Sequence, residues 1–234
     1  MPLKILDTAE DEFSLGPSED GTYEEANGGT EMMKNQLYSR VDPDLLDQFQ
    51  IICSRVRWVD SKKPTILWCH DTWDDPESQH LKEEERRKQF EKFIFVSNYQ
   101  LSTYNMALQV PYAQSFVMQN AIDPIELKDK NKDQIKLIYH TTPHRGLNVA
   151  VAAIMELAKK HGDKIHFDVF SSFEAYGWKD RDKEFEDLFN NIKEHPQMTY
   201  HGYQPNEKVR EALQESHIFA YPSIWPETSC IAAI

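Results

Sequence analysis

The sequence predicts an α/β protein that is built on parallel sheets and divided into two domains. Short apolar runs alternate with helical patterns along most of the 234 residues, as strand–helix–strand units require. This length exceeds the usual size of one domain. A polar stretch at residues 124–134 has little to bury and separates two such series. We therefore expect one domain at residues 1–123, a linker at residues 124–134 and a second domain at residues 135–234.

In the first half, apolar runs predict the strands and amphipathic patterns predict the helices. The expected strands are Leu3–Leu6, Phe49–Cys53, Thr65–Cys69, Phe93–Ser97 and Phe116–Met118. The expected helices are Thr30–Arg40, Lys82–Lys92 and Asn98–Met106.

The second half repeats the alternation. The expected strands are Ile135–Tyr139, Ile165–Phe170, Met198–Tyr200 and Ile218–Tyr221. The expected helices are Gly146–Lys160, Lys183–Lys193 and Asn206–Ser216, with Asn206 as the N-cap of the third. A last helix begins near Glu227 and has barely started at Ile234. We therefore expect the native polypeptide to continue and the second domain to be incomplete.

The charge and hydropathy of the chain disfavour several classes of partner. The formal net charge of -13 disfavours nucleic acids and anionic membranes, which bind through excess lysine and arginine. Residues 1–31 hold nine acidic residues against Lys4, and we interpret this stretch as a solvated loop. No apolar run approaches the roughly 18 residues of a membrane span, and no secretory leader begins the chain. With three cysteines that we interpret as reduced, these features predict a cytoplasmic protein.

A glycine pair precedes the first expected helix. Gly28 and Gly29 let a ligand approach the backbone, and a helix N-terminus favours an anion. The pair is a candidate phosphate or acceptor loop. A plain glycine turn, with Thr30 as the helix cap, is the alternative.

A histidine and an aspartate end one of the expected strands. His70 and Asp71 follow Thr65–Cys69, at the edge where open α/β sheets bind ligands. We interpret His70 as a ligand contact, and a histidine that caps the next segment or bonds to Asp71 is the alternative. No third ligand follows at helical spacing, so we expect no metal here.

In the second half, a basic and hydroxyl-bearing loop joins a strand to a long helix. Thr141, Thr142, Arg145 and Gly146 place hydroxyls and a guanidinium beside the helix N-terminus. This arrangement is typical of a diphosphate site. An Arg145 that pairs with one of the many surface acids is the alternative.

The last loop holds a glutamate at the start of the final expected helix. A carboxylate at Glu227 can accept hydrogen bonds from sugar hydroxyls. It also suits the helix dipole without any ligand.

Taken in chain order, these motifs resemble those of the retaining, nucleotide-sugar-dependent glycosyltransferases of family 4. The resemblance spans nearly the whole chain, and the order of the motifs carries it. The matching segments are Gly28-Gly29-x-Glu31, His70, Val96-Ser97, Asn120-Ala121-Ile122-Asp123, Arg145-Gly146-Leu147 and Pro222-Ser223-x-x-x-Glu227-Thr228. Two features depart from the family. Ala121 replaces a glycine, and His140, Thr141 and Thr142 stand where the family carries the arginine of a Gly-Arg pair.

The resemblance implies a GT-B fold, in which two Rossmann-like domains with parallel sheets face each other across a cleft. It implies hexosyl transfer from a nucleotide-diphosphate sugar to an unknown glycan, lipid or small-molecule acceptor, with retention of anomeric configuration and no metal or cofactor. The implied catalytic residues are His70, Arg145 and Glu227. The implied donor and phosphate-binding residues are Gly28, Gly29, Thr141, Thr142, Arg145, Gly146, Thr228 and Ser229. The second glutamate of the family's Glu-x7-Glu motif falls one position beyond Ile234, so we expect little or no activity from these residues alone.

Three other hypotheses stay open. A nucleotide-sugar-binding protein without turnover fits the missing arginine and the change at Ala121. A GT-B-like sugar-nucleotide epimerase and an unrelated doubly wound α/β binding domain are the others. The donor sugar, its base and the acceptor are not specified by these motifs.

Overall fold

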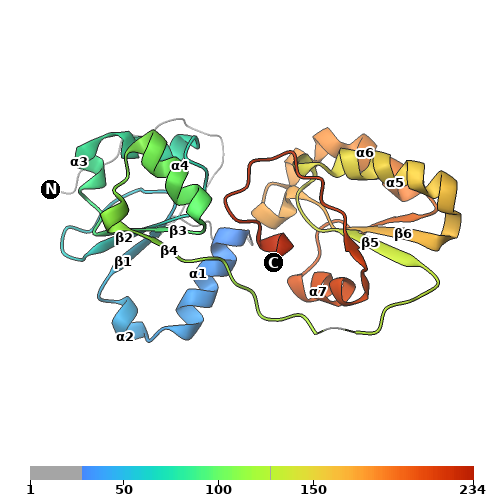
Figure 1. Ribbon diagram of the computed structural model, residues 1–234, viewed down its shortest axis with the longest axis horizontal. Helices are drawn as coiled ribbons and strands as arrows, with labels where there is room; N and C mark the ends of the chain where they lie inside the picture. The colour runs from blue at the N-terminus through green and yellow to red at the C-terminus, as the bar shows by residue number, and fades with distance from the viewer. Residues whose placement is uncertain (1–27, 127) are drawn as a thin grey trace. The chain divides into compact units, whose positions relative to one another are not determined.

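The computed structural model describes residues 28–126 and 128–234, which divide into two compact units (Figure 1). The first unit contains residues 28–121 together with Glu227–Ile231, and the second contains Ile122–Pro226 with Ala232–Ile234. Each unit has its own four-stranded parallel sheet. The strand expected at Leu3–Leu6 and most of the acidic stretch lie outside the described residues.

The sheet of the first unit has the order β1-β2-β3-β4, and every pair of neighbours is parallel. Its strands are β1 (Gln50–Cys53), β2 (Thr65–Cys69), β3 (Lys92–Phe95) and β4 (Ser115–Val117). The helices are α1 (Gly29–Arg40), α2 (Pro43–Leu46), α3 (Glu84–Arg87) and α4 (Asn98–Leu108), with 3₁₀ helices at Pro76–Lys82 and Tyr112–Gln114. Helix α4 packs on one face of the sheet, and α1 packs on the other.

The helix expected over Lys82–Lys92 is wrong. The chain instead forms the 3₁₀ helix and the single turn of α3, which are separate elements. The Nη1 atom of Arg87 donates to the carbonyls of Leu81, Lys82 and Leu108 at 2.7 to 3.1 Å. In a continuous helix the carbonyls of Leu81 and Lys82 would not reach the guanidinium of Arg87. The bonds of this buried guanidinium therefore fix the bend between the 3₁₀ helix and α3.

The sheet of the second unit has the order β7-β6-β5-β8, and every pair is again parallel. Its strands are β5 (Ile135–Tyr139), β6 (Ile165–Val169), β7 (Met198–Tyr200) and β8 (Ile218–Phe219). The helices are α5 (Leu147–His161), α6 (Glu186–Glu194) and α7 (Asn206–Glu215). Short 3₁₀ helices lie at Pro143–Arg145, Gly162–Lys164, Phe173–Tyr176, Lys179–Phe185 and Ile231–Ala233.

Helices α5 and α6 bury their apolar sides against one face of this sheet, and α7 lies on the opposite side (Figure 1). The chain moves outward from β5 to β7 and then returns to place β8 on the other side of β5. Right-handed crossovers put the returning helix on the opposite face. The order therefore reverses between β5 and β8, and ligands bind at the carboxyl ends of strands beside such a reversal.

The polar segment expected as the linker makes hydrogen bonds within the second unit. Arg210 on α7 donates to the carbonyls of Asp123 and Pro124 at 3.1 and 2.8 Å. Nε2 of His217 bonds the carbonyl of Asn131 at 2.8 Å, and Lys130 bonds the carbonyl of Ser216. Backbone carbonyls of the segment and the Lys130 side chain therefore make the attachment.

Two details of the expected helices change. Pro205, rather than Asn206, is the N-cap of α7, because its carbonyl accepts the first helical bond, from the amide of Lys208 at 2.9 Å. The helix expected from Glu227 is absent, and only the 3₁₀ turn Ile231–Ala233 forms near it. The carbonyls of Thr228 and Ser229 accept bonds from side chains of the first unit, which replace helical bonds there.

No helix within the described ranges is both long enough and apolar enough to cross a membrane.

A buried histidine predicts acid sensitivity of the first unit. Burial first, and then the charge of Arg86, lowers the pKa of His80 to about 4 from 6.5. Within the described residues neither ring nitrogen has a hydrogen-bond partner. The folded-state pKa is the lower one, so this contribution to stability is complete above about pH 6.5 and is lost as pH falls toward 4.

We expect the free energy of unfolding to fall by roughly 1.4 kcal/mol per pH unit for this group alone in that window. The His80→Leu variant should show a shallower dependence between pH 7 and pH 5 in urea unfolding monitored by tryptophan fluorescence. Equal slopes for the variant and the wild type would contradict the assignment.

Candidate functional site

The loop between β5 and α5 is a tight turn that is stabilised by hydrogen bonds among residues 139–145. The hydroxyl of Tyr139, the last residue of β5, donates to the carbonyl of Thr142 at 3.0 Å. The amide of Arg145 donates to the same carbonyl at 3.2 Å and closes the 3₁₀ turn. Gly146 then adopts a φ of 106°, which L side chains rarely adopt, and α5 begins at the next residue.

Gly146 also allows a close approach of two backbone segments. A Cβ atom at this position would lie 2.2 Å from the carbonyl oxygen of Pro222, which follows β8. The Arg-Gly-Leu motif and the Pro-Ser motif therefore meet at the carboxyl ends of β5 and β8. This is where the strand order reverses, as expected for a ligand site.

Buried hydroxyls surround the start of α5. The Oγ1 atoms of Thr141 and Thr142 are buried without a hydrogen-bond partner in the described part of the chain. The same holds for Oγ of Ser171, which follows β6 and is 2% exposed. Burying a hydroxyl without a partner is costly, so such groups in one region mark a candidate ligand site. Ser171 was not identified from the sequence. The rule that selected His70, a polar residue directly after a strand, would also have selected Ser171.

The start of α5 adds backbone donors to these hydroxyls. No side chain caps the helix at Gly146. The first amides of an uncapped helix carry positive partial charge and favour anions. The half-buried Arg145 stands directly before this helix start. The region therefore suits an anion with several acceptor oxygens.

His140 does not supply a second positive charge here. Its ring lies 4.5 Å from that of Phe219, and burial lowers the pKa of His140 to about 4. The imidazole is therefore neutral at neutral pH. Arg145 remains the basic residue of the segment 139–146.

Aromatic rings join the loops that follow β5, β6 and β8. His144 stacks on Phe173 with centroids 5.1 Å apart, and the rings of His144 and Trp225 form a T-shaped pair with centroids 4.7 Å apart. The guanidinium of Arg181 lies 4.5 Å from the centroid of Phe173. Phe173 was not singled out in the sequence, because stacking between loops leaves no periodic pattern.

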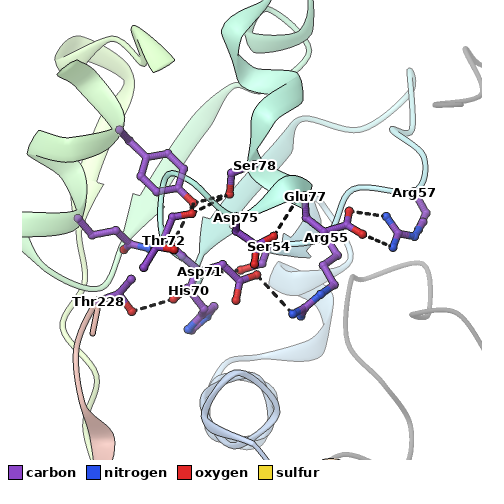
Figure 2. A network of polar contacts seen from close by, with 12 residues as sticks. Ser54, Arg55, Arg57, His70, Asp71, Thr72, Asp75, Glu77, Ser78 and Thr228 are labelled. Carbon is purple, nitrogen blue, oxygen red and sulfur yellow. Dashed lines mark hydrogen bonds and ion pairs between the residues drawn. The ribbon is translucent and has the colours of Figure 1, made fainter. Parts of the chain in front are cut away.

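In the first unit, a serine hydroxyl shapes the loop that holds His70 (Figure 2). Ser54, directly after β1, has a φ of 63°. Its Oγ accepts from the amide of His70 at 2.8 Å and from that of Asp71 at 3.3 Å. Ser54 was also missed from the sequence, because this role depends on a neighbouring strand.

His70 is a largely buried, neutral imidazole. Burial first, and then the charge of Arg55, lowers its pKa to about 3. The ring lies 4.7 Å from that of Trp68, and Nε2 has no hydrogen-bond partner in residues 28–126 and 128–234. A neutral imidazole of this kind can exchange one hydrogen bond with a ligand hydroxyl. At neutral pH it is a poor source of positive charge.

A set of charged side chains extends from Asp71 (Figure 2). Arg55 lies 3.7 Å from the Asp71 carboxylate, and Arg57 binds Glu77 through two bonds of 2.7 Å. Burial, followed by the charge of Asp71, raises the pKa of Asp75. Among the described residues, no group of three or more His, Cys, Asp or Glu is arranged to hold a metal ion.

The segment Glu227–Ile231 belongs to this first unit, which differs from its expected place in the second domain. The Oγ1 atom of Thr228 donates to the carbonyl of His70 at 2.8 Å (Figure 2). The structure thus brings Thr228 to His70. The phosphate role expected of Thr228 and Ser229 is not tested by this contact.

Gly29, the second residue of the glycine pair, has a packing role. Gly28 precedes α1 and no side chain caps the helix there, so Thr30 is not its cap. A Cβ atom at Gly29 would lie 2.9 Å from Cδ1 of Ile231. The small residue therefore lets Ile231 pack against the start of α1.

The sequence profile of the family described as glycosyl transferases group 1 matches residues 118–234, which is half of the chain. No curated protein matches the sequence at a significant level.

Solved structures with the same fold include a glycosyltransferase from Rickettsia africae ESF-5. The TM-score is 0.55 at 15% identity, over 85% of this chain and 56% of that one. The catalytic domain of starch synthase IV from Arabidopsis thaliana, bound to ADP and acarbose, matches with a TM-score of 0.48 at 12% identity, over 83% and 50%. The chain thus spans about half the length of these structures. The predicted α/β fold with parallel sheets, of the GT-B type, is confirmed.

The contact between Gly146 and the Pro222 carbonyl yields a stability prediction. We expect Gly146→Ala to lower the free energy of unfolding by about 2 to 4 kcal/mol, because backbone strain and a collision with a carbonyl add together. Gly202→Ala is the matched control: φ there is 66°, and the nearest atom to a Cβ lies at 3.8 Å. It should cost about 1 kcal/mol. Equal losses for both variants in thermal unfolding would show that the Pro222 contact is unimportant.

Proposed function

The chain belongs to the group 1 glycosyl transferases, and from this membership we propose that it transfers a hexose from a nucleotide-diphosphate sugar to an acceptor hydroxyl, with retention of anomeric configuration. The family supports a sugar donor and an acceptor in general. The nature of the donor, the stereochemistry and the roles of individual residues are our proposal.

The observation that carries the proposal is the group of buried, unpartnered hydroxyls near the uncapped start of α5. Oγ1 of Thr142 and Oγ of Ser171 have no acceptor or donor within the described residues. A diphosphate would offer oxygens to both hydroxyls, to the first amides of α5 and to Arg145. The fixed turn at Gly146 holds these donors before any ligand arrives.

The proposed reaction needs donors more than it needs a base. The bond between the anomeric carbon and the phosphate oxygen breaks, and the acceptor oxygen bonds to that carbon from the same face. The acceptor proton passes to the departing phosphate oxygen. Arg145 and the α5 amides stabilise the negative charge that develops there, which is where fixed donors lower a barrier most. The proposal assigns no metal or cofactor to this step.

In the first unit, we assign sugar contacts to His70 and Glu227. His70 is neutral, and its Nε2 can bond a sugar hydroxyl. Glu227 is half-buried and directly precedes Thr228, which bonds the His70 carbonyl. The acceptor in this proposal is a glycan, lipid or small molecule. The net charge of -13 disfavours a strongly anionic lipid surface. The location in this proposal is the cytoplasm.

One observation favours a second function, a nucleotide-sugar-binding protein without turnover. His140 stands in the region of the family's Gly-Arg arginine, and burial lowers its pKa to about 4. The segment therefore offers one positive side chain to the diphosphate, where the family offers two. Less charge stabilisation slows bond cleavage more than it weakens binding.

Binding of a nucleoside diphosphate tests the role of Arg145. We expect Arg145→Ala to weaken the binding of UDP or GDP by about 1.5 to 3 kcal/mol in calorimetry, because a charge-assisted contact is lost. Lys159→Ala is the control, since this exposed lysine pairs with Glu156 in the last turn of α5. Unchanged affinity in Arg145→Ala would remove this residue from the site.

Release of nucleotide separates the two functions. We expect the chain to show weak but detectable release of nucleoside diphosphate from at least one member of a panel of UDP- and GDP-sugars when candidate acceptors are added, as measured by a coupled assay. Slow release without acceptor would also indicate transfer, to water. Binding of a donor with neither kind of release would favour the protein without turnover.

A further inference from the structure

The segment Glu227–Ile231 lies along the carboxyl edge of the first sheet, where three successive strands hold it. His70 follows β2, Ser97 lies just beyond β3, and Asn120 follows β4. Each contributes one hydrogen bond to the segment. Parallel sheets usually present this edge to a ligand, so here part of the protein's own chain occupies it.

Thr228 is bonded through both its side chain and its backbone. Its Oγ1 donates to the His70 carbonyl at 2.8 Å (Figure 2). Its own carbonyl accepts from Oγ of Ser97 at 2.6 Å. Two bonds to different strand ends fix both the position and the rotation of this residue.

The Ser97 hydroxyl cannot easily turn away from this bond. Its Oγ also accepts from the amide of Gln100 at 3.1 Å and so caps α4. With its acceptor side used by the cap, its proton is directed to the Thr228 carbonyl. Helix α4 therefore sets the direction of the bond that holds the segment.

Asn120 and Ile231 hold the rest of the segment. Nδ2 of Asn120, a residue that is 9% exposed, donates to the Ser229 carbonyl at 3.1 Å. Ile231 packs into the apolar cluster that contains Met33, Cys53 and Trp68. The segment is thus attached to the first unit at Thr228, Ser229 and Ile231.

We propose that Ser97 and Asn120 are positioning residues, which act through the backbone of Thr228 and Ser229 to fix Glu227 relative to His70. The inference rests on the proposed function, in which these two side chains contact a sugar. Because the residues 227–229 have no helical bonds of their own, the contacts with the strand ends fix the backbone that carries Glu227. A carboxylate that is already oriented binds a sugar hydroxyl with less loss of conformational freedom.

Four variants of the full chain separate this role from simple folding. Ser97→Asp keeps an acceptor for the α4 cap and loses the proton given to Thr228. Ser97→Thr keeps both. Asn120→Asp has the same shape and loses the amide donor. Thr103→Val is the control, because its hydroxyl bonds the Gln100 carbonyl within α4, away from the segment.

Amide hydrogen exchange at residues 228–231 reports the attachment. We expect exchange that is roughly threefold to tenfold faster in Ser97→Asp and Asn120→Asp, as the loss of one hydrogen bond implies. Ser97→Thr and Thr103→Val should exchange like the wild type. Unchanged exchange in Ser97→Asp and Asn120→Asp would overturn the proposal, since the segment would then be held by other groups.

Affinity for paired ligands reports the positioning. UDP-glucose and GDP-mannose carry the sugar, and UDP and GDP are the same ligands without it. We expect Ser97→Asp and Asn120→Asp to bind the nucleotide-sugars about threefold to tenfold more weakly, with unchanged affinity for UDP and GDP. Ser97→Thr should restore the sugar-dependent part. A purely structural defect would weaken both kinds of ligand or neither, and either result would overturn the proposal.

The two proposals fail in different ways. If the wild type binds none of the four ligands, the proposed function is wrong, and the positioning role is lost with it. A second pattern of results would show that only the positioning role is wrong. In that pattern the wild type binds the ligands and Arg145→Ala weakens the binding of UDP or GDP, but the Ser97 and Asn120 variants leave every affinity unchanged.

Discussion

The carbonyl group of Pro222 lies where a side chain of residue 146 would otherwise be, and the candidate anion site depends on this contact. Without a Cβ atom, Gly146 can take its positive φ, and the segment after β8 can reach the start of α5. Any larger residue at position 146 would push apart the loops that follow β5 and β8. The hydroxyls and amides near α5 are therefore held by backbone contacts that exist without a ligand, which is the condition for strong stabilisation of a developing charge.

The first unit uses its strand ends in another way. In the second unit, polar groups beyond β5 and β6 remain without partners in the described structure. In the first unit, the groups beyond β2, β3 and β4 bond the segment Glu227–Ile231. One edge is thus left open to a ligand, and the other is partly filled by the chain itself. The same strand-end geometry serves binding in one unit and attachment in the other.

The sequence predicted the elements that depend on interactions between residues close in the chain, and it failed for those that depend on residues distant in the chain. Apolar runs placed β2, β5 and β7 with the observed bounds, because burial of a parallel strand leaves a local pattern. The strand-end rule selected His70, and the position of the loop before a helix N-terminus selected Thr142; both residues lie in candidate sites. The helices expected at Lys82–Lys92 and Glu227 failed, since Arg87 and Ser97 bond carbonyls that are distant in sequence. Ser54 was missed for a related reason: a serine gives no local sign that its hydroxyl bonds the loop of a neighbouring strand.

The contact between Gly29 and Ile231 makes two distant positions interdependent. A side chain added at residue 29 would collide with the isoleucine that anchors the segment, while a smaller residue at 231 would leave a space beside α1. In relatives that keep this arrangement, the two positions should therefore vary together, with an alanine or serine at the first accompanied by a shorter side chain at the second. A pair correlated in this way would record the docking of the segment in sequences alone, without any measurement of structure.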